Sequence, residues 1–267
     1  MGPFEVSGFL SEDLAGYKNH ILEKFSDLYN EVLRINEYAQ QLQYKLNIHK
    51  ENPDELVTAI LYARTISTYQ ALILVSERGM LQQVKMLLRC MLESLFPLVA
   101  ISENEGYSKE LISADEIERL KALNKLIRYK EHNGEEDKDL EDARRLAATV
   151  KQNIEKNGIK KIRVEDTARK AKLIDWYDTI YSHLSNTIHP SMRSLEEHLH
   201  IDADNDLEVL KNESETEGLD TLYIAAIESM LFAVKAIGRL FKIEVEGFVE
   251  KASKNIRRYS QNNRFEG

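Results

Sequence analysis

The stretch MLQQVKMLLRCMLESLFPLVAIS, residues 80–102, decides the fold class. Its apolar residues recur on nearly every side of a helix of this length, which predicts a central helix surrounded by others. Arg89 and Glu93 interrupt the apolar run four residues apart, so both lie on one helical face. We expect the two charges to pair, because burying a charge without a partner is strongly unfavourable. The stretch therefore predicts a buried core helix that carries one polar pair.

Helical patterns with clear end signals flank this core helix. One helix is expected over 12–46, and the sequence NPDE at 52–55 begins another, because an Asn cap, an early Pro and acidic residues favour a helix start. A last apolar helix is expected over 219–242. Only 11 Gly and 4 Pro occur among 267 residues, too few to punctuate many short strands. We predict an all-α helical bundle that forms a single domain over 1–267.

Several segments are unusually charged. Residues 103–172 predict a charged helical insertion, in which a capping box at 113–116 is expected to begin one helix. The end of that insertion, 156–172, carries seven basic and two acidic residues. Eight acidic residues against one Lys over 202–220 predict an exposed acidic loop. Residues 251–267 predict a basic tail, which could bind a single strand through its basic and aromatic side chains or simply be a solvated helix face.

Composition and motifs exclude several classes of protein. The most apolar stretch, 84–101, contains three charged residues and a Pro, so no segment reaches the roughly 20 apolar residues of a membrane-spanning helix. The first residues lack the pattern of a signal peptide and one Cys cannot form an internal disulfide, so we expect a cytoplasmic protein. No nucleotide-binding Gly-rich loop occurs, and Glu197 and His200 form a lone E-x-x-H motif. We expect neither a cofactor nor a metal.

A second polar pattern lies in IYSHLSNTIHPSMR, residues 180–193. Tyr181, Ser185 and His189 recur every four residues and so follow one helix edge. His189 precedes Pro190, which disfavours helical backbone at His189. We therefore expect its imidazole at a helix break, beside exposed amide groups that favour a phosphate. The alternative is that His189 caps a helix and fills a polar niche.

These two patterns together resemble an uncharacterised bacterial family of all-helical proteins that is similar to the HEPN-like nucleases. The matching motifs are R-x-x-x-E at Arg89 and Glu93 and S-x-x-x-H-P at 185–190. The resemblance implies a four-helix core with additional helices, a homodimer, and metal-independent RNA cleavage in a bacterial defence or toxin system. HEPN ribonucleases carry an Arg four to six residues before the His, but residues 183–185 here contain none. Arg89 would supply this charge from the neighbouring helix.

The resulting hypothesis is a ribonuclease whose site lies between the two motifs. Arg89 would stabilise negative charge on phosphate, Glu93 would orient Arg89, and His189 would act as general acid or base. The expected substrate-binding residues are Tyr181, Ser185, Asn186 and Arg193. The alternative is a non-catalytic interaction or regulatory protein that uses the same Arg, Glu and His as an internal polar network. A partner protein from the same system is a further expected partner. A catalytic site would open to solvent, whereas such a network would be sealed by apolar residues.

Overall fold

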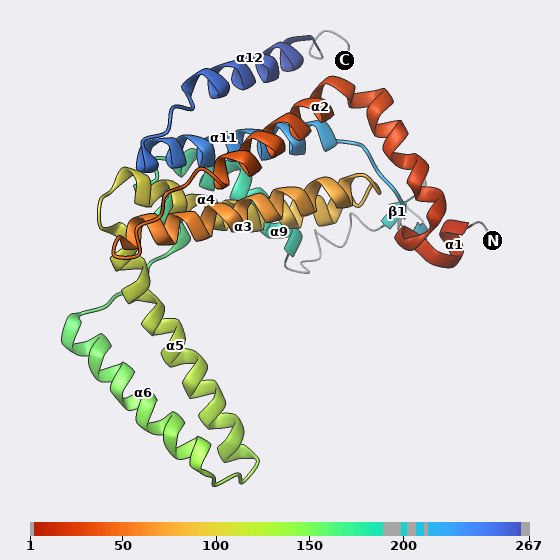
Figure 1. Ribbon diagram of the computed structural model, residues 1–267. Helices are drawn as coiled ribbons and strands as arrows, with labels where there is room; N and C mark the ends of the chain where they lie inside the picture. Colours follow the sequence, from red (N-terminus) through yellow and green to blue (C-terminus); the bar gives the residue numbers. More distant parts are fainter. Residues whose placement is uncertain (1–2, 189–198, 202–206, 211–212, 263–267) are drawn as a thin grey trace.

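Helix α4 (Leu81–Glu103) lies at the centre of an all-α bundle and packs against α3 (Pro53–Ser76) and α11 (Leu219–Phe241) in the computed structural model (Figure 1). The structure describes residues 3–188, 199–201, 207–210 and 213–262. The other long helices are α2 (Tyr17–Gln43), α5 (Tyr107–His132), α6 (Lys138–Asn157) and α12 (Glu246–Asn262). The short elements are α1 (Pro3–Ser7), 3₁₀ turns at Gly8–Leu10 and Glu12–Gly16, α7 (Val164–Lys170), α8 (Ile174–Trp176), a π-helical turn (Tyr177–Tyr181), α9 (Ser182–Ile188), β1 (Leu199–Ile201) and β2 (Leu207–Leu210).

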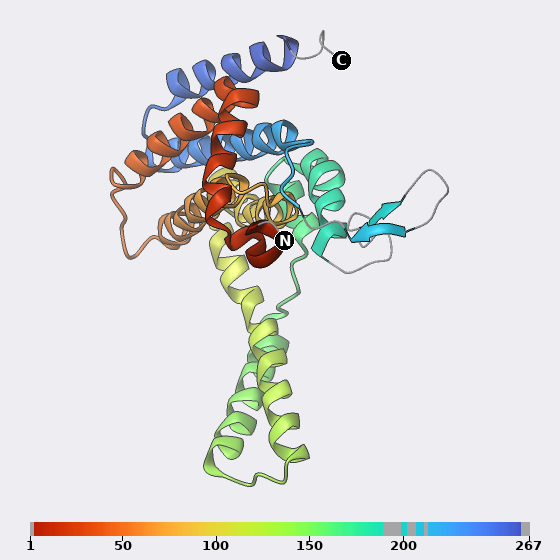
Figure 2. The ribbon, with the colours of Figure 1, turned by 90° about the vertical axis from the view of Figure 1, so that its right-hand side faces the viewer.

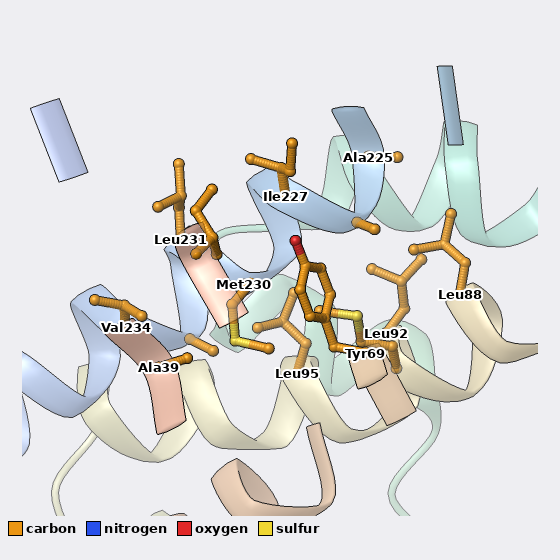
Figure 3. Close-up of a cluster of buried hydrophobic side chains, with 14 of the residues drawn as sticks. Ala39, Tyr69, Leu88, Leu92, Leu95, Ala225, Ile227, Met230, Leu231 and Val234 are labelled. Atoms are coloured by element: carbon orange, nitrogen blue, oxygen red, sulfur yellow. The ribbon is translucent and has the colours of Figure 1, made fainter. Parts of the chain in front are cut away.

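Apolar side chains from α2, α3, α4 and α11 meet in one core. Figure 3 shows Leu92 and Leu95 of α4 facing Met230 of α11, with the ring of Tyr69 from α3 between them. All four side chains are fully buried. The hydroxyl of Tyr69 donates to the carbonyl oxygen of Val32 in α2 at 3.1 Å, so this buried polar group is satisfied. The predicted all-α bundle with a central helix is confirmed.

The predicted start of α3 is also confirmed. The side chain of Asn52 accepts hydrogen bonds from the backbone amides of Asp54 (3.1 Å) and Glu55 (3.4 Å), as expected of an N-cap.

The first predicted helix, 12–46, is divided: a 3₁₀ turn precedes α2, and α2 itself bends at Phe25, whose backbone is non-helical (φ −132°, ψ 30°).

The predicted capping box at 113–116 is wrong, because α5 begins six residues earlier, at Tyr107. Its cap comes from another helix. The carboxylate of Asp54 at the start of α3 accepts hydrogen bonds from the amides of Gly106 (2.6 Å) and Ser108 (3.2 Å). Helix α5 therefore has no capping side chain at its own N-terminus, and Asp54 of α3 satisfies these two backbone amides instead.

Helices α5 and α6 form a hairpin that projects from the bundle (Figures 1 and 2). The seam between them buries Leu140, Ala143, Ala147 and Val150 of α6. None of these four residues belongs to the main hydrophobic core. The hairpin thus has a small core of its own and occupies most of the charged segment 103–172.

The C-terminal third differs from the expected loop and tail. Residues 207–210 of the expected acidic loop 202–220 form strand β2, which pairs antiparallel with β1 outside the helical bundle (Figure 2), and α11 already begins at Leu219. Much of the expected basic tail 251–267 lies in α12, which packs against α2. Strand β2 is too short for an alternating pattern to be detected, and α12 is polar apart from a few buried apolar residues such as Val249, Ala252 and Ile256. Among the described residues, no helix is long and apolar enough to cross a membrane.

Candidate functional site

The polar edge of α4 carries Arg89, Glu93 and Pro97 at intervals of four residues. The predicted pairing of Arg89 with Glu93 is confirmed, but the pair is only partly buried, because the two side chains are 16% and 34% exposed. Neighbouring apolar positions such as Leu88 and Leu92 are fully buried. The core helix therefore presents one partly open polar edge, and the two charges lie on it.

The chain opposite this edge winds as a π-helical turn, Tyr177–Tyr181, followed directly by α9. The hydroxyl of Ser182 donates to the carbonyl oxygen of Tyr177, five residues earlier, at 2.8 Å. A π turn changes the angular position of the residues that follow it, and such turns are frequent at functional sites. Tyr181, which ends the turn, packs its buried ring edge-on against Phe96 of α4.

Four side chains from these two segments form a hydrogen-bonded group, which we call the Arg89 cluster: Arg89, Glu93, Tyr181 and Ser185. Arg89 Nη1 lies 3.0 Å from Glu93 Oε1. Arg89 Nη2 donates to the Tyr181 hydroxyl at 3.0 Å, and Arg89 Nε donates to the Ser185 hydroxyl at 3.2 Å. The Tyr181 hydroxyl in turn donates to Glu93 Oε1 at 3.0 Å, and Ser185 Oγ donates to the Tyr181 carbonyl oxygen at 2.8 Å. The guanidinium plane is thus held from three sides.

The electrostatics of the cluster keep Tyr181 protonated. Burial raises the pKa of Tyr181 to about 12, and the negative charge of Glu93 adds to the rise, while the positive charge of Arg89 opposes it. The hydroxyl therefore stays a hydrogen-bond donor at neutral pH. It cannot serve as a general base there.

Arg89 keeps hydrogen-bonding capacity beyond the cluster. A guanidinium has five N–H donors, and the cluster uses one on each of the three nitrogens. One N–H on Nη1 and one on Nη2 have no partner within the part of the chain that the structure describes. Nη1 and Nη2 face Glu93 Oε1 and the Tyr181 hydroxyl, which are 3.0 Å apart, so their parallel hydrogens are used and the two remaining hydrogens point to opposite sides of the guanidinium. Each of them can bind one oxygen of a phosphate or a carboxylate.

Beside the cluster, Glu93 forms part of the wall of a cavity of about 220 Å³ between α4, the base of α5 and residues 161–167. Its apolar walls include Phe96 and Pro97. Lys161 and Arg163 bring positive charge to the same cavity, but Asp115 and Glu118 line it as well, and Arg163 pairs with Asp166 at 3.0 Å. Sequence reasoning missed Lys161 and Arg163 as part of the site, although both lie in the basic run 156–172 that it identified.

The structure brings together four of the predicted site residues, Arg89, Glu93, Tyr181 and Ser185, and leaves three undetermined. His189 and Arg193 lie outside the described residues, and Asn186 belongs to α9 but its side chain is not described. The expected approach of His189 to Arg89 therefore stays a prediction. Within the described ranges, no group of three or more His, Cys, Asp or Glu side chains is arranged to hold a metal.

Comparison with known proteins places the cluster inside a family. No curated protein and no solved structure matches the chain. One family model, described as a family of unknown function (DUF5677), matches residues 55–207, which is more than half of the chain and contains the whole Arg89 cluster. The match does not bear on the resemblance to HEPN-like nucleases, which stays a prediction. The chain belongs to DUF5677, a family of unknown function.

Proposed function

We propose that this protein is a metal-independent ribonuclease whose phosphate-binding site is the Arg89 cluster. The observation that carries the proposal is the fixed guanidinium of Arg89 on a partly open helix edge, where one donor on each terminal nitrogen has no partner among the described residues. A charge-assisted hydrogen bond from one of these donors to a non-bridging oxygen of a phosphodiester would stabilise the charge that develops during cleavage.

The proposed reaction uses the substrate's own 2'-hydroxyl as nucleophile, since the cluster offers no deprotonated hydroxyl. The 2'-oxygen would bond to phosphorus as the bond to the 5'-oxygen breaks. A base would take the 2'-hydroxyl proton, and an acid would return a proton to the 5'-oxygen, leaving a 2',3'-cyclic phosphate. On sequence grounds we assign the acid and base work to His189, which follows α9 four residues after Ser185.

A second candidate function rests on the same contacts. Glu93, Tyr181 and Ser185 contact all three nitrogens of Arg89, and the Arg89 side chain is only 16% exposed. The cluster could then join α4 to α9 in a non-catalytic interaction or regulatory protein. In that case Arg89 would stabilise the packing of α9 without touching any substrate.

An RNA cleavage assay separates the two functions. Purified protein is incubated with several single-stranded RNAs and matching DNA, with and without a chelator, beside Arg89→Ala, His189→Ala and the control Arg64→Ala, an exposed Arg on α3. We expect RNA cleavage with cyclic phosphate ends that survives chelation, spares DNA, and falls at least a hundredfold in Arg89→Ala and His189→Ala only.

The same assay can contradict each part of the proposal. Loss of cleavage on chelation would overturn the metal-independent mechanism. Absence of cleavage across all RNAs would overturn the ribonuclease and favour the second function, as would Arg64→Ala behaving like Arg89→Ala. Thermal melting of each variant separates lost activity from lost folding.

We also infer that the protein acts as a homodimer in the cytoplasm, as part of a bacterial defence or toxin system, with RNA as its macromolecular substrate. The outer face of α3 supports a dimer, because Leu56, Ile60 and Leu74 are 41%, 60% and 64% exposed there. Light scattering on the purified protein measures its mass directly. A monomer at micromolar concentration would contradict the homodimer.

A further inference from the structure

A groove of about 470 Å³ runs between α2 and α12, away from the Arg89 cluster. The two helices lie side by side (Figures 1 and 2), and the ring of Tyr38 in α2 stacks on Phe248 in α12. The bend of α2 at Phe25 lies within the groove wall. The groove has the size of a small-molecule site, since such sites usually span about 300–1,000 Å³. It shares no residue with the cluster.

The floor of the groove is a buried carboxylate whose partners are fixed. Glu31 is 7% exposed and accepts hydrogen bonds from Arg34 Nε at 2.9 Å and Arg34 Nη2 at 2.5 Å. Asn255 Nδ2 of α12 donates to the same carboxylate at 3.1 Å. The guanidinium of Arg34 also lies over the ring of Phe248, 4.6 Å from its centre. Glu31 therefore holds Arg34 and Asn255 rigidly at the groove.

These contacts leave donors and acceptors available in the groove. Arg34 Nη1 has no partner in the described part of the chain, so two N–H donors of a fixed guanidinium remain. The side-chain oxygen of Asn255 likewise has no described partner, because only its nitrogen binds Glu31. A fixed amide oxygen beside fixed N–H donors can form hydrogen bonds with the polar edge of a heterocyclic ring, such as a nucleotide base.

The rim of the groove is positive and aromatic. Glu31 and Arg34 neutralise each other, and Lys24 and Arg258 then outnumber the single carboxylate of Asp27. Tyr259, the residue after Arg258, also lines the groove and is half-buried. Cations bind phosphate, aromatic rings stack on bases, and amides bind base edges.

We propose that the groove between α2 and α12 binds one nucleotide unit, either as a free nucleotide or as part of a single-stranded RNA. Lys24 and Arg258 take the phosphate, Tyr259 stacks on the base, and Asn255 binds the base edge. The inference is independent of the proposed cleavage, because it concerns other residues and requires binding alone.

The test is equilibrium binding of the full chain to 5'-AMP, inorganic phosphate and a short single-stranded RNA, each in its own titration. Arg258→Ala is compared with Arg257→Ala, its sequence neighbour, which is exposed on α12, lies near Glu228 and does not line the groove. We expect Arg258→Ala and Tyr259→Ala to weaken binding about tenfold and Arg257→Ala less than twofold. All titrations are repeated in Arg89→Ala, which removes the proposed cleavage site, and the weakening caused by Arg258→Ala should persist in that background.

Each outcome has one meaning. A free-nucleotide site is supported if AMP binds more tightly than phosphate and this binding is weakened in Arg258→Ala and Tyr259→Ala. A strand site is supported if only RNA binds more tightly than phosphate and the same two variants weaken its binding. Equal effects of Arg257→Ala and Arg258→Ala, equal affinity for AMP and phosphate, or no binding of any probe would overturn the proposal. Because binding is measured with Arg89→Ala as well, failure of the ribonuclease proposal leaves this result readable.

Discussion

The ion pair of Arg89 and Glu93 lies on a partly open helix edge, and its energetic value depends on that exposure. Removing one partner of a fully buried pair costs about 3–5 kcal/mol, whereas exposed pairs contribute about 0–1 kcal/mol. Here Glu93 is 34% exposed, and Arg89 keeps hydrogen bonds to Tyr181 and Ser185 without it. Glu93→Ala should therefore lower the free energy of unfolding by about 1 kcal/mol, measured by urea denaturation.

A second ion pair of the same spacing provides the control. Glu165 and Arg169 of α7 are also four residues apart, and Glu165 is 33% exposed, but Arg169 is 64% exposed against 16% for Arg89. Glu165→Ala should cost at most about 0.5 kcal/mol. If Glu93→Ala lowers the free energy of unfolding by about 3 kcal/mol or more, the pair behaves as a fully buried one, which would contradict a partly open site. Equal losses of unfolding free energy in the two variants would show that the lower exposure of Arg89 does not strengthen its ion pair.

At the scale of single elements, the turn between α3 and α4 depends on Gly79. Its φ is +68°, and an added Cβ would lie 2.6 Å from the Tyr17 ring, 2.7 Å from Ser214 Cβ and 2.8 Å from the backbone nitrogen of Glu215. The left-handed backbone costs a non-Gly residue about 1–2 kcal/mol, and overpacking adds about 1–3 kcal/mol. Gly79→Ala should lower the free energy of unfolding by about 2–5 kcal/mol, measured by denaturation.

Gly134, in the turn between α5 and α6, separates the two causes. Its φ is +69°, and an added Cβ would meet nothing within 4 Å. Gly134→Ala should thus show the backbone cost alone, about 1–2 kcal/mol. Equal effects of the two substitutions would mean that the contacts of Gly79 with Tyr17 and Ser214 do not restrict that turn.

The helix ends show which elements the sequence could predict. Asn52 caps its own helix, and Gly158 ends α6 with a left-handed backbone, so both ends follow from local residues. The start of α5 could not be read locally, because Asp54 of α3 supplies its cap. Spacing alone indicated that Arg89 pairs with Glu93, but the contact of Tyr181 with both depends on a π turn that no local pattern announces.

At the scale of the whole molecule, the projecting hairpin of α5 and α6 separates into a base and an outer part. The base belongs to the bundle: Tyr107 is a buried core residue, and Leu111, Asp115 and Glu118 line the cavity beside Glu93. The buried seam residues of the outer part lie outside the main core, and α6 packs against α5. Bundle stability and the cavity should therefore depend on the base alone.

Replacing residues 121–149 by a short Asn-Gly turn tests this division, because it removes the outer part and keeps every cavity residue. The shortened protein should melt within about 4 °C of the full chain, since about 1 kcal/mol corresponds to 2–4 °C for a domain of this size. Tyr107→Ala, at the base, should instead cost about 3–5 kcal/mol, because it empties a fully buried site in the core. Calorimetry of both variants gives the comparison. If the shortened chain melts like Tyr107→Ala or loses its cooperative transition, the outer hairpin stabilises the bundle and the division into two parts is wrong.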